Sequence, residues 1–317
     1  MTYTRATLVW YLVGVMAVLT LASFVLTGLT VDFSSNPWVF LSIGGILATS
    51  FFYRYRRPNP QLCALTEAAA QLLLILLFGI LLTYAAVAAK FPYVDAELYA
   101  IDNAIGFSRH GYLKFFAGRP WLAQILEVAY FCMLPQLALV PAIMFLAKKF
   151  ERVQRMMVAI VISLLATAFI SVLTPSLTAF VYVDLAQMAS VPADIYTPAP
   201  TLEALRAGTM RAVRLDHLEG LVSFPSFHTT AAMIFAWTLR KVRYVGLAGI
   251  LLNLTLIAAT PLVGAHYFID LVGGAVVAFA AMALSHWLCR RAKADELSAI
   301  SVRDADSDLA RSAQASI

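Results

Sequence analysis

The chain of 317 residues is 61% hydrophobic and 13% charged, and its mean hydropathy is +0.80. Soluble domains carry roughly 25% charged residues, so a water-soluble fold of this length could not bury so much apolar surface. The composition therefore excludes an ordinary soluble domain and predicts a polytopic, all-α membrane protein. The net charge of +5 does not predict a nucleic-acid partner, because the basic residues form short clusters between apolar runs.

Apolar runs long enough to cross a bilayer recur along the chain. About 20 apolar residues, rising 1.5 Å each, cross a hydrocarbon core of roughly 30 Å. By that measure the sequence predicts about eight spans, centred near Val15, Ile46, Ile75, Leu134, Ser163, Phe235, Leu254 and Ala278. The first run exceeds the roughly 7–15 apolar residues of a signal peptide, so we expect it to be retained as a helix.

The basic clusters alternate with the spans and predict an orientation. The clusters are Arg54, Arg56 and Arg57; Lys148, Lys149, Arg152 and Arg155; Arg240, Lys241 and Arg243; and Arg290, Arg291 and Lys293. The positive-inside rule places all of them in the cytoplasm, together with both termini. The residues after Arg291 are charged, small and poor in aromatics, which predicts a disordered or loosely helical cytoplasmic tail over 292–317.

Two longer loops remain on the predicted outer side, at 90–120 and 175–221. Both carry basic residues, which normally avoid that side. The residues are Arg109, Lys114, Arg119, Arg206, Arg211 and Arg214. Such residues either bind an anionic group or were carried across with a long loop regardless of charge.

No metal or cofactor is predicted. The three cysteines, Cys63, Cys132 and Cys289, are far apart and lack the Cys/His spacing of a zinc site. Their odd number also argues against a disulfide framework. A glycine-rich nucleotide-binding loop of the GxxxxGK[ST] kind is absent from the sequence.

The segment FPSFH, residues 224–228, ends the second outer loop and begins the sixth predicted span. Ser226 is a candidate N-cap, and Pro225 sets the chain direction before the helix. A helix N-terminus offers free N–H groups and the positive end of the dipole, which suit a phosphate. His228 is then expected to face the anion, although a histidine packed into a helix start is the alternative.

The segment GAHYFID, residues 264–270, begins the eighth predicted span. His266 and Asp270 are four residues apart and share one face of a helix. The carboxylate can hold one imidazole nitrogen and leave the other free to attack. A metal half-site is the weaker alternative, because no third carboxylate or histidine lies at helical spacing. The predicted topology brings both segments to the same outer level.

These two segments resemble signature motifs of the type 2 phosphatidic acid phosphatase superfamily. Within it they are most similar to the inositol phosphorylceramide synthase branch, in which FPSxH is followed by HYxxD and a small-residue helix. The resemblance is specific over about residues 220–275 and more diffuse back to the DNAIGF segment, 102–107, and the AYFCMLPQ segment, 129–136. It implies two additional N-terminal helices over 1–57 and a six-helix phosphatase-type catalytic core over 58–291.

The resemblance also implies roles for individual residues. His266 would form a phosphohistidine, with Asp270 orienting it. His228 would protonate the leaving oxygen and later activate the acceptor. Ser226 and Phe227 would hold the phosphate through backbone N–H groups and a hydroxyl.

The basic phosphate ligands depart from the family pattern. The family's first motif separates a Lys from an Arg-Pro pair by six residues, but Lys114 and Arg119 are separated by four. The Arg expected six residues before the third-motif His is Thr260 here. We therefore expect Arg206 and Arg214 to complete the phosphate clamp.

Three functions follow as hypotheses. The first is a lipid phosphotransferase that moves a phosphoryl-headgroup between a phospholipid and an alcohol at the outer face, in a bacterial inner membrane. The second is a lipid phosphatase acting on phosphatidic acid, phosphatidylglycerophosphate or a polyprenyl pyrophosphate, with water as acceptor. The third is a transporter or structural protein, which the lack of internal repeats and broken helices disfavours.

Overall fold

The computed structural model describes residues 3–182 and 199–315. Over these ranges the chain forms twelve α-helices, one 3₁₀-helix and one pair of three-residue strands. The helices are α1 (Tyr3–Thr27), α2 (Trp38–Tyr55), α3 (Pro60–Ala88), α4 (Asp95–Ala104), α5 (Arg109–Ala117), α6 (Pro120–Phe131), α7 (Met133–Leu146), α8 (Phe150–Leu173), α9 (Ala199–Ala207), α10 (Phe227–Leu239), α11 (Val245–Val263) and α12 (Phe268–Ala315). The 3₁₀-helix η1 spans Ala179–Tyr182, and the strands are β1 (Thr30–Asp32) and β2 (Ala212–Arg214).

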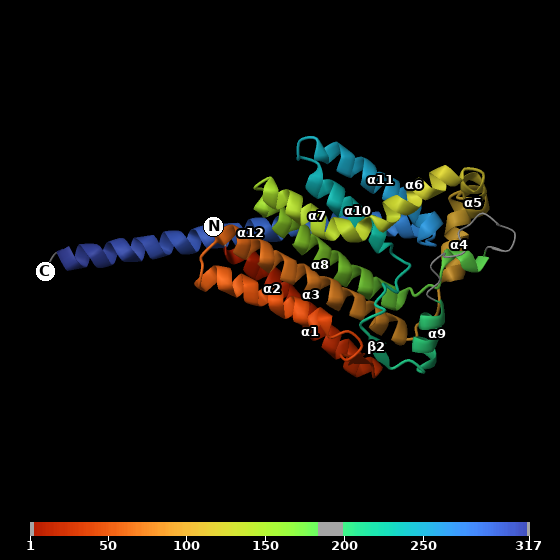
Figure 1. The fold of residues 1–317 in the computed structure, drawn as a ribbon, viewed down its shortest axis with the longest axis horizontal. Coiled ribbons are helices and arrows are strands. Elements are labelled where there is room, and N and C mark those ends of the chain that lie inside the picture. The colour runs from red at the N-terminus through yellow and green to blue at the C-terminus, as the bar shows by residue number, and fades with distance from the viewer. Residues whose placement is uncertain (1–2, 183–198, 316–317) are drawn as a thin grey trace.

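The long helices form an elongated bundle whose centre is α8 (Figure 1). Four successive α8 residues, 158–161, are fully buried, so protein covers every face of that helix. Helices α1, α3, α10 and α12 pack around it. The small strands β1 and β2 pair in parallel and join the loop after α1 to the segment before α10.

Five helices within the described residues are long and apolar enough to cross a membrane: α1, α3, α8, α11 and the first part of α12. The pair α6 and α7, bent by 55° at a short break, makes a sixth. All eight predicted span centres lie in helices, but the other two helices fall short of this measure. Helix α10 has only 13 residues, about 20 Å, and α2 ends in Tyr53, Arg54 and Tyr55.

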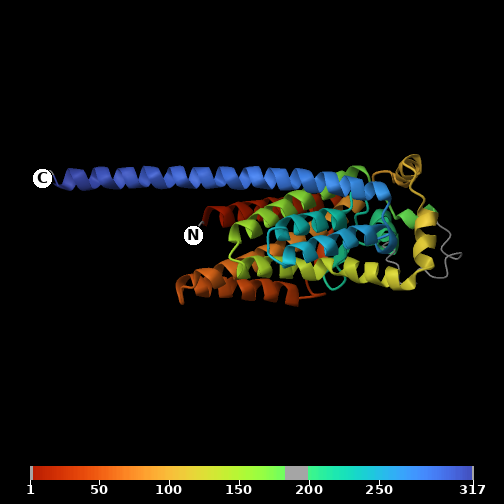
Figure 2. The same ribbon diagram turned by 90° about the horizontal axis from the view of Figure 1, so that it is seen from above.

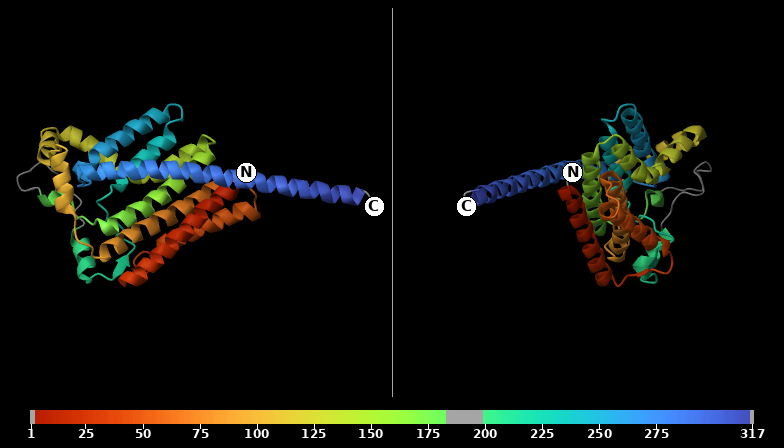
Figure 3. Two further views of the ribbon diagram at one scale, coloured as in Figure 1. Left: turned by 180° about the vertical axis from the view of Figure 1, so that it is seen from behind. Right: turned by 60° about the vertical axis from the view of Figure 1, so that its left-hand side comes forward.

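The backbone over the predicted tail is helical as far as Ala315. Helix α12 contains 48 residues and extends far beyond the rest of the bundle (Figures 2 and 3). Its C-terminal half contains no Gly or Pro and is rich in Ala, which favours helix even where few apolar residues are available for packing.

Basic side chains gather at one end of the bundle. Arg152, near the start of α8, donates to the Thr238 carbonyl near the end of α10 at 2.6 Å. Lys293 of α12 pairs with Glu151 of α8 at 3.4 Å. His228 lies at the opposite end of α10 from Arg240, and His266 precedes the start of α12. The two histidine segments are therefore at the end of the bundle opposite to these basic residues.

Candidate active site

The start of α10 is built by Ser226, as the sequence predicts for an N-cap. Its hydroxyl accepts a hydrogen bond from the Thr229 N–H at 3.3 Å. Its own N–H donates to the Asp270 carbonyl of α12 at 3.0 Å, and the residue is fully buried. Both polar groups of Ser226 therefore have protein partners, and its predicted phosphate contact stays a prediction. Phe227 packs against the hydrophobic core.

Helices α10 and α12 are locked together beside this cap. The Thr230 hydroxyl bonds the carbonyls of Ser226 at 3.0 Å and Gly274 at 2.8 Å. A Cβ on Gly274 would lie 2.4 Å from the Ser226 carbonyl oxygen, so only glycine permits this approach. The two helix starts that carry the histidine motifs are consequently held at a fixed spacing.

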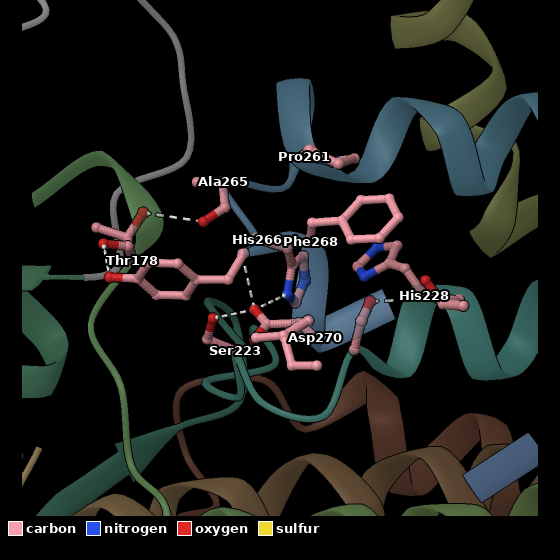
Figure 4. A network of polar contacts seen from close by, with 12 residues as sticks. Thr178, Ser223, His228, Pro261, Ala265, His266, Phe268 and Asp270 are labelled. Atoms are coloured by element: carbon pink, nitrogen blue, oxygen red, sulfur yellow. Dashed lines mark hydrogen bonds and ion pairs between the residues drawn. The ribbon is translucent and has the colours of Figure 1, made fainter. Parts of the chain in front are cut away.

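His266 and Asp270 form the predicted pair. The His266 Nδ1 lies 3.0 Å from the Asp270 Oδ2, and both side chains are buried (Figure 4). The same oxygen accepts hydrogen bonds from the Tyr267 N–H at 3.0 Å and from the Ser223 hydroxyl at 2.8 Å. Within the described part of the chain, the Asp270 Oδ1 is buried without a hydrogen-bond partner. A carboxylate on Nδ1 leaves Nε2 as the imidazole atom available for reaction.

His228 faces His266 across a small cavity (Figure 4), with 6.2 Å between the ring centroids and 62° between the ring planes. The cavity has a volume of about 40 Å³, enough for a few water-sized groups. It is lined by Tyr130, Leu177, Thr178, Gly220, Leu221, Val222, Ser223, His228, Gly264, Ala265 and His266. Among these lining residues, all in the described part of the chain, there is no Lys or Arg.

The four basic residues predicted to clamp the phosphate do not line this cavity. Lys114 and Arg119 are exposed, and Arg119 lies 4.0 Å over the Phe115 ring. Arg206 lies 4.0 Å over the Tyr93 ring and bonds the Lys90 carbonyl at 3.5 Å. Their assignment as phosphate ligands stays a prediction.

Arg214 already has an anionic partner. Its guanidinium bonds both carboxylate oxygens of Asp216, at 3.1 and 2.5 Å. This hydrogen bonding raises the pKa of Arg214 and lowers the pKa of Asp216 below its usual range. An arginine whose fork is occupied by a neighbouring carboxylate has less to offer a substrate phosphate.

Helix α4 contributes a buried carboxylate to which sequence reasoning gave no role. The Asp102 carboxylate accepts hydrogen bonds from the N–H groups of Phe268 and Ile269, both at 2.8 Å. It therefore caps the N-terminus of α12 from a residue 166 positions earlier. Burial raises the pKa of Asp102, while the two N–H groups and the Arg109 charge act in the opposite direction.

Two further buried residues hold the turn between α11 and α12. Arg109 donates to the carbonyls of Pro261, at 3.3 Å, and His266. Asp95 accepts hydrogen bonds from the Tyr267 hydroxyl at 3.0 Å and from the Leu177 N–H. We call Asp95, Asp102 and Arg109 the α4–α5 clasp. The only sequence signal for these three residues was their charge, in a segment too polar to span a bilayer.

Comparison with known families places most of these residues in one matched region. A family model described as PAP2 superfamily matches residues 96–284, more than half of the chain. The matched region contains both histidines, Asp270 and two of the three clasp residues. Searches of curated proteins and of solved structures gave no significant match.

Proposed function

The chain belongs to the PAP2 superfamily of membrane phosphatases and phosphotransferases, and on that premise we propose that it is a lipid phosphotransferase. It moves a phosphoryl-headgroup from a phospholipid to an alcohol through a phosphohistidine. The proposal assigns His266 as the nucleophile, Asp270 as its orienting carboxylate and His228 as the acid and base.

The reaction has two steps. The His266 Nε2 attacks phosphorus, the P–O bond to the donor alcohol breaks, and His228 gives its proton to the leaving oxygen. The acceptor alcohol then attacks phosphorus, the P–N bond breaks, and His228 takes the acceptor's proton. The Asp270 carboxylate stabilises positive charge on the His266 ring in the intermediate. Both histidines end the cycle in their starting protonation states.

The observation that carries the proposal is the lack of Lys and Arg among the described lining residues of the cavity. A phosphate monoester carries close to two negative charges at neutral pH, whereas a diester carries one. Burying a dianion without a cationic partner costs more than burying a monoanion. A cavity lined by two histidines and no permanent cation therefore favours a diester donor, and a diester donor delivers a headgroup.

The arrangement of the bundle supports a site at the outer face. Basic side chains of α8, α10 and α12 lie at the end away from the histidines. Basic residues collect on the cytoplasmic side of membrane proteins. We accordingly place both termini in the cytoplasm, with the cavity toward the outside of the cell or the periplasm.

A groove between α6 and α11 supports a lipid as substrate. It has a volume of about 450 Å³ and is lined mainly by apolar side chains, including Ile125, Val128, Ala129 and Leu252. Ala129 borders this groove, and the next residue, Tyr130, borders the cavity. An acyl chain in the groove would place its phosphate beside the histidines.

Filling the groove tests this placement. We expect Val128→Trp to raise KM for a long-chain phospholipid roughly fivefold, because losing about ten atom contacts costs about 1 kcal/mol. A short-chain analogue should keep its KM. Val276→Trp is the matched control, since Val276 is as exposed as Val128, at 63% against 60%, but lies on α12. Equal effects of the two variants, measured by steady-state kinetics in detergent, would remove the groove from the proposal.

The function itself is tested by incubating the purified protein with a phospholipid panel plus ceramide, diacylglycerol and inositol, followed by lipid mass spectrometry. A new phosphodiester lipid that is absent with His266→Ala supports headgroup transfer and identifies donor and acceptor together. Loss of a monoester lipid with release of inorganic phosphate would instead establish a lipid phosphatase. No conversion of any lipid would overturn both.

A further inference from the structure

His228 has an aromatic partner that neither motif contains. Tyr130, in the last turn of α6, stacks on the His228 ring with 4.3 Å between the centroids and 13° between the planes. Its hydroxyl lies 3.4 Å from the His228 Nδ1, a long hydrogen bond. Tyr130 is itself 8% exposed and lines the cavity with both histidines. One phenol therefore contacts both the face and the inner nitrogen of this imidazole.

The position of the phenol is enforced by the turn that carries His266. A Cβ on Gly264 would lie 2.7 Å from the Tyr130 hydroxyl oxygen and 2.9 Å from the His266 Cδ2. Any larger residue at 264 would displace one of these side chains, because real Cβ atoms do not approach so closely. The backbone conformation of Gly264 is ordinary, with φ at −86°, so the requirement is for space.

The two histidines consequently have partners of different chemistry. The His266 Nδ1 meets the Asp270 carboxylate at 3.0 Å, and the His228 Nδ1 meets a neutral phenol. A carboxylate only accepts hydrogen bonds and favours the imidazolium form. A phenol oxygen can accept from the His228 Nδ1–H both in the imidazolium and in the neutral tautomer that keeps this proton, and a neutral phenol does not favour the charged form as a carboxylate does.

We infer that Tyr130 is a positioning residue that holds the His228 Nε2 toward the reacting phosphate while leaving the ring free to gain and lose its proton. The inference rests on the proposed role of His228 as acid and then base. In the first step His228 gives the Nε2 proton to the leaving oxygen, while its Nδ1–H stays bonded to the Tyr130 oxygen and keeps Nε2 as the free nitrogen. In the second step the acceptor's proton returns to Nε2, and the bond at Nδ1 is unchanged.

The test compares Tyr130→Phe with the wild type on two donors that carry the same headgroup phosphate. One donor releases an aliphatic alcohol, which needs a proton as it leaves. The other releases p-nitrophenol, which leaves readily as an anion. We expect Tyr130→Phe to lower the single-turnover rate constant for release of the leaving group about tenfold on the first donor, with substrate affinity within about twofold, and to leave the rate constant on the second nearly unchanged. Single-turnover release reports the first step alone, so the result does not depend on the acceptor.

Tyr112→Phe is the matched control, because the Tyr112 hydroxyl also bonds a neighbouring helix, at the Ala258 carbonyl, without contacting a histidine. It should match the wild type on both donors. Tyr130→Leu removes the stacked ring as well and should slow the aliphatic donor more than Tyr130→Phe does.

If Tyr130→Phe slows release of the leaving group equally from both donors, its role is generally structural and the inference is overturned. The inference is also overturned if Tyr130→Phe releases the leaving group from both donors at the wild-type rate. Failure of the proposed function has a different signature. If the acceptor is water, the leaving-group dependence of Tyr130→Phe persists while mass spectrometry shows the headgroup phosphate monoester in place of a new diester.

Discussion

Replacing His266 with glutamine is expected to lower kcat by at least about 10⁴-fold, the scale of loss when a covalent nucleophile is removed. Glutamine is close to histidine in size and keeps a polar group beside Asp270, but it cannot form the phosphorus–nitrogen bond. The measurement is lipid turnover by mass spectrometry, together with trapping of an acid-labile phosphoenzyme in the wild type. The phosphoenzyme should be absent from the variant.

His217→Gln is the control for this prediction. The His217 side chain is 82% exposed and lies 3.7 Å from the Asp216 carboxylate. We expect it to turn over substrate like the wild type. Residual phosphoenzyme in His266→Gln would contradict the assignment and transfer the nucleophilic role to another group, with His228 as the first to test.

Replacing Asp270 with asparagine separates the charge of this residue from its geometry. All three donors to its side chain, on His266, Tyr267 and Ser223, reach the same oxygen, Oδ2. The other oxygen is buried without a hydrogen-bond partner among the described residues. An asparagine with its carbonyl oxygen at the Oδ2 position can keep all three hydrogen bonds; it loses the negative charge and places its NH₂ group where the partnerless oxygen was.

We expect Asp270→Asn to lower kcat by about 10³- to 10⁴-fold while the protein unfolds near the wild-type temperature. In the proposed mechanism, the charge stabilises the imidazolium that forms when His266 is phosphorylated. Asp270→Ala is the comparison: it strands three buried donors, each costing about 1–3 kcal/mol, and should lower the unfolding temperature as well. Wild-type kcat in Asp270→Asn, measured beside thermal unfolding in detergent, would show that the carboxylate acts by geometry alone.

The local parts of this site could be predicted from sequence, because they depend on short spacings. The four-residue interval from His266 to Asp270 predicts their contact, and the structure confirms it at 3.0 Å. Ser226 before an apolar run predicts a helix cap, which the Thr229 N–H confirms. In both cases the partner lies within one helical turn, where backbone geometry alone fixes the neighbour.

The parts that depend on tertiary contacts could not be predicted. Tyr130 reaches His228 from 98 positions away, and Asp102 reaches Phe268 from 166. Charge also says nothing about whether an arginine already has a partner. Arg214 was predicted as a phosphate ligand, but its guanidinium is bound to Asp216. Helix α10 was predicted as a full span because hydropathy is averaged over a window that also includes the turn before the helix begins.

The α4–α5 clasp has a consequence for how the chain is made. The Asp102 carboxylate on α4 is synthesised long before its donors, the N–H groups of Phe268 and Ile269 at the start of the last helix. We expect Asp102 to stay in water at the membrane surface until α12 is inserted, because a buried carboxylate without donors is costly. A ribosome-bound chain that stops short of residue 264 contains neither His266 nor the groups that Asp102 caps. The site is therefore completed in the final stage of membrane insertion, when the start of α12 packs against α4 and α5.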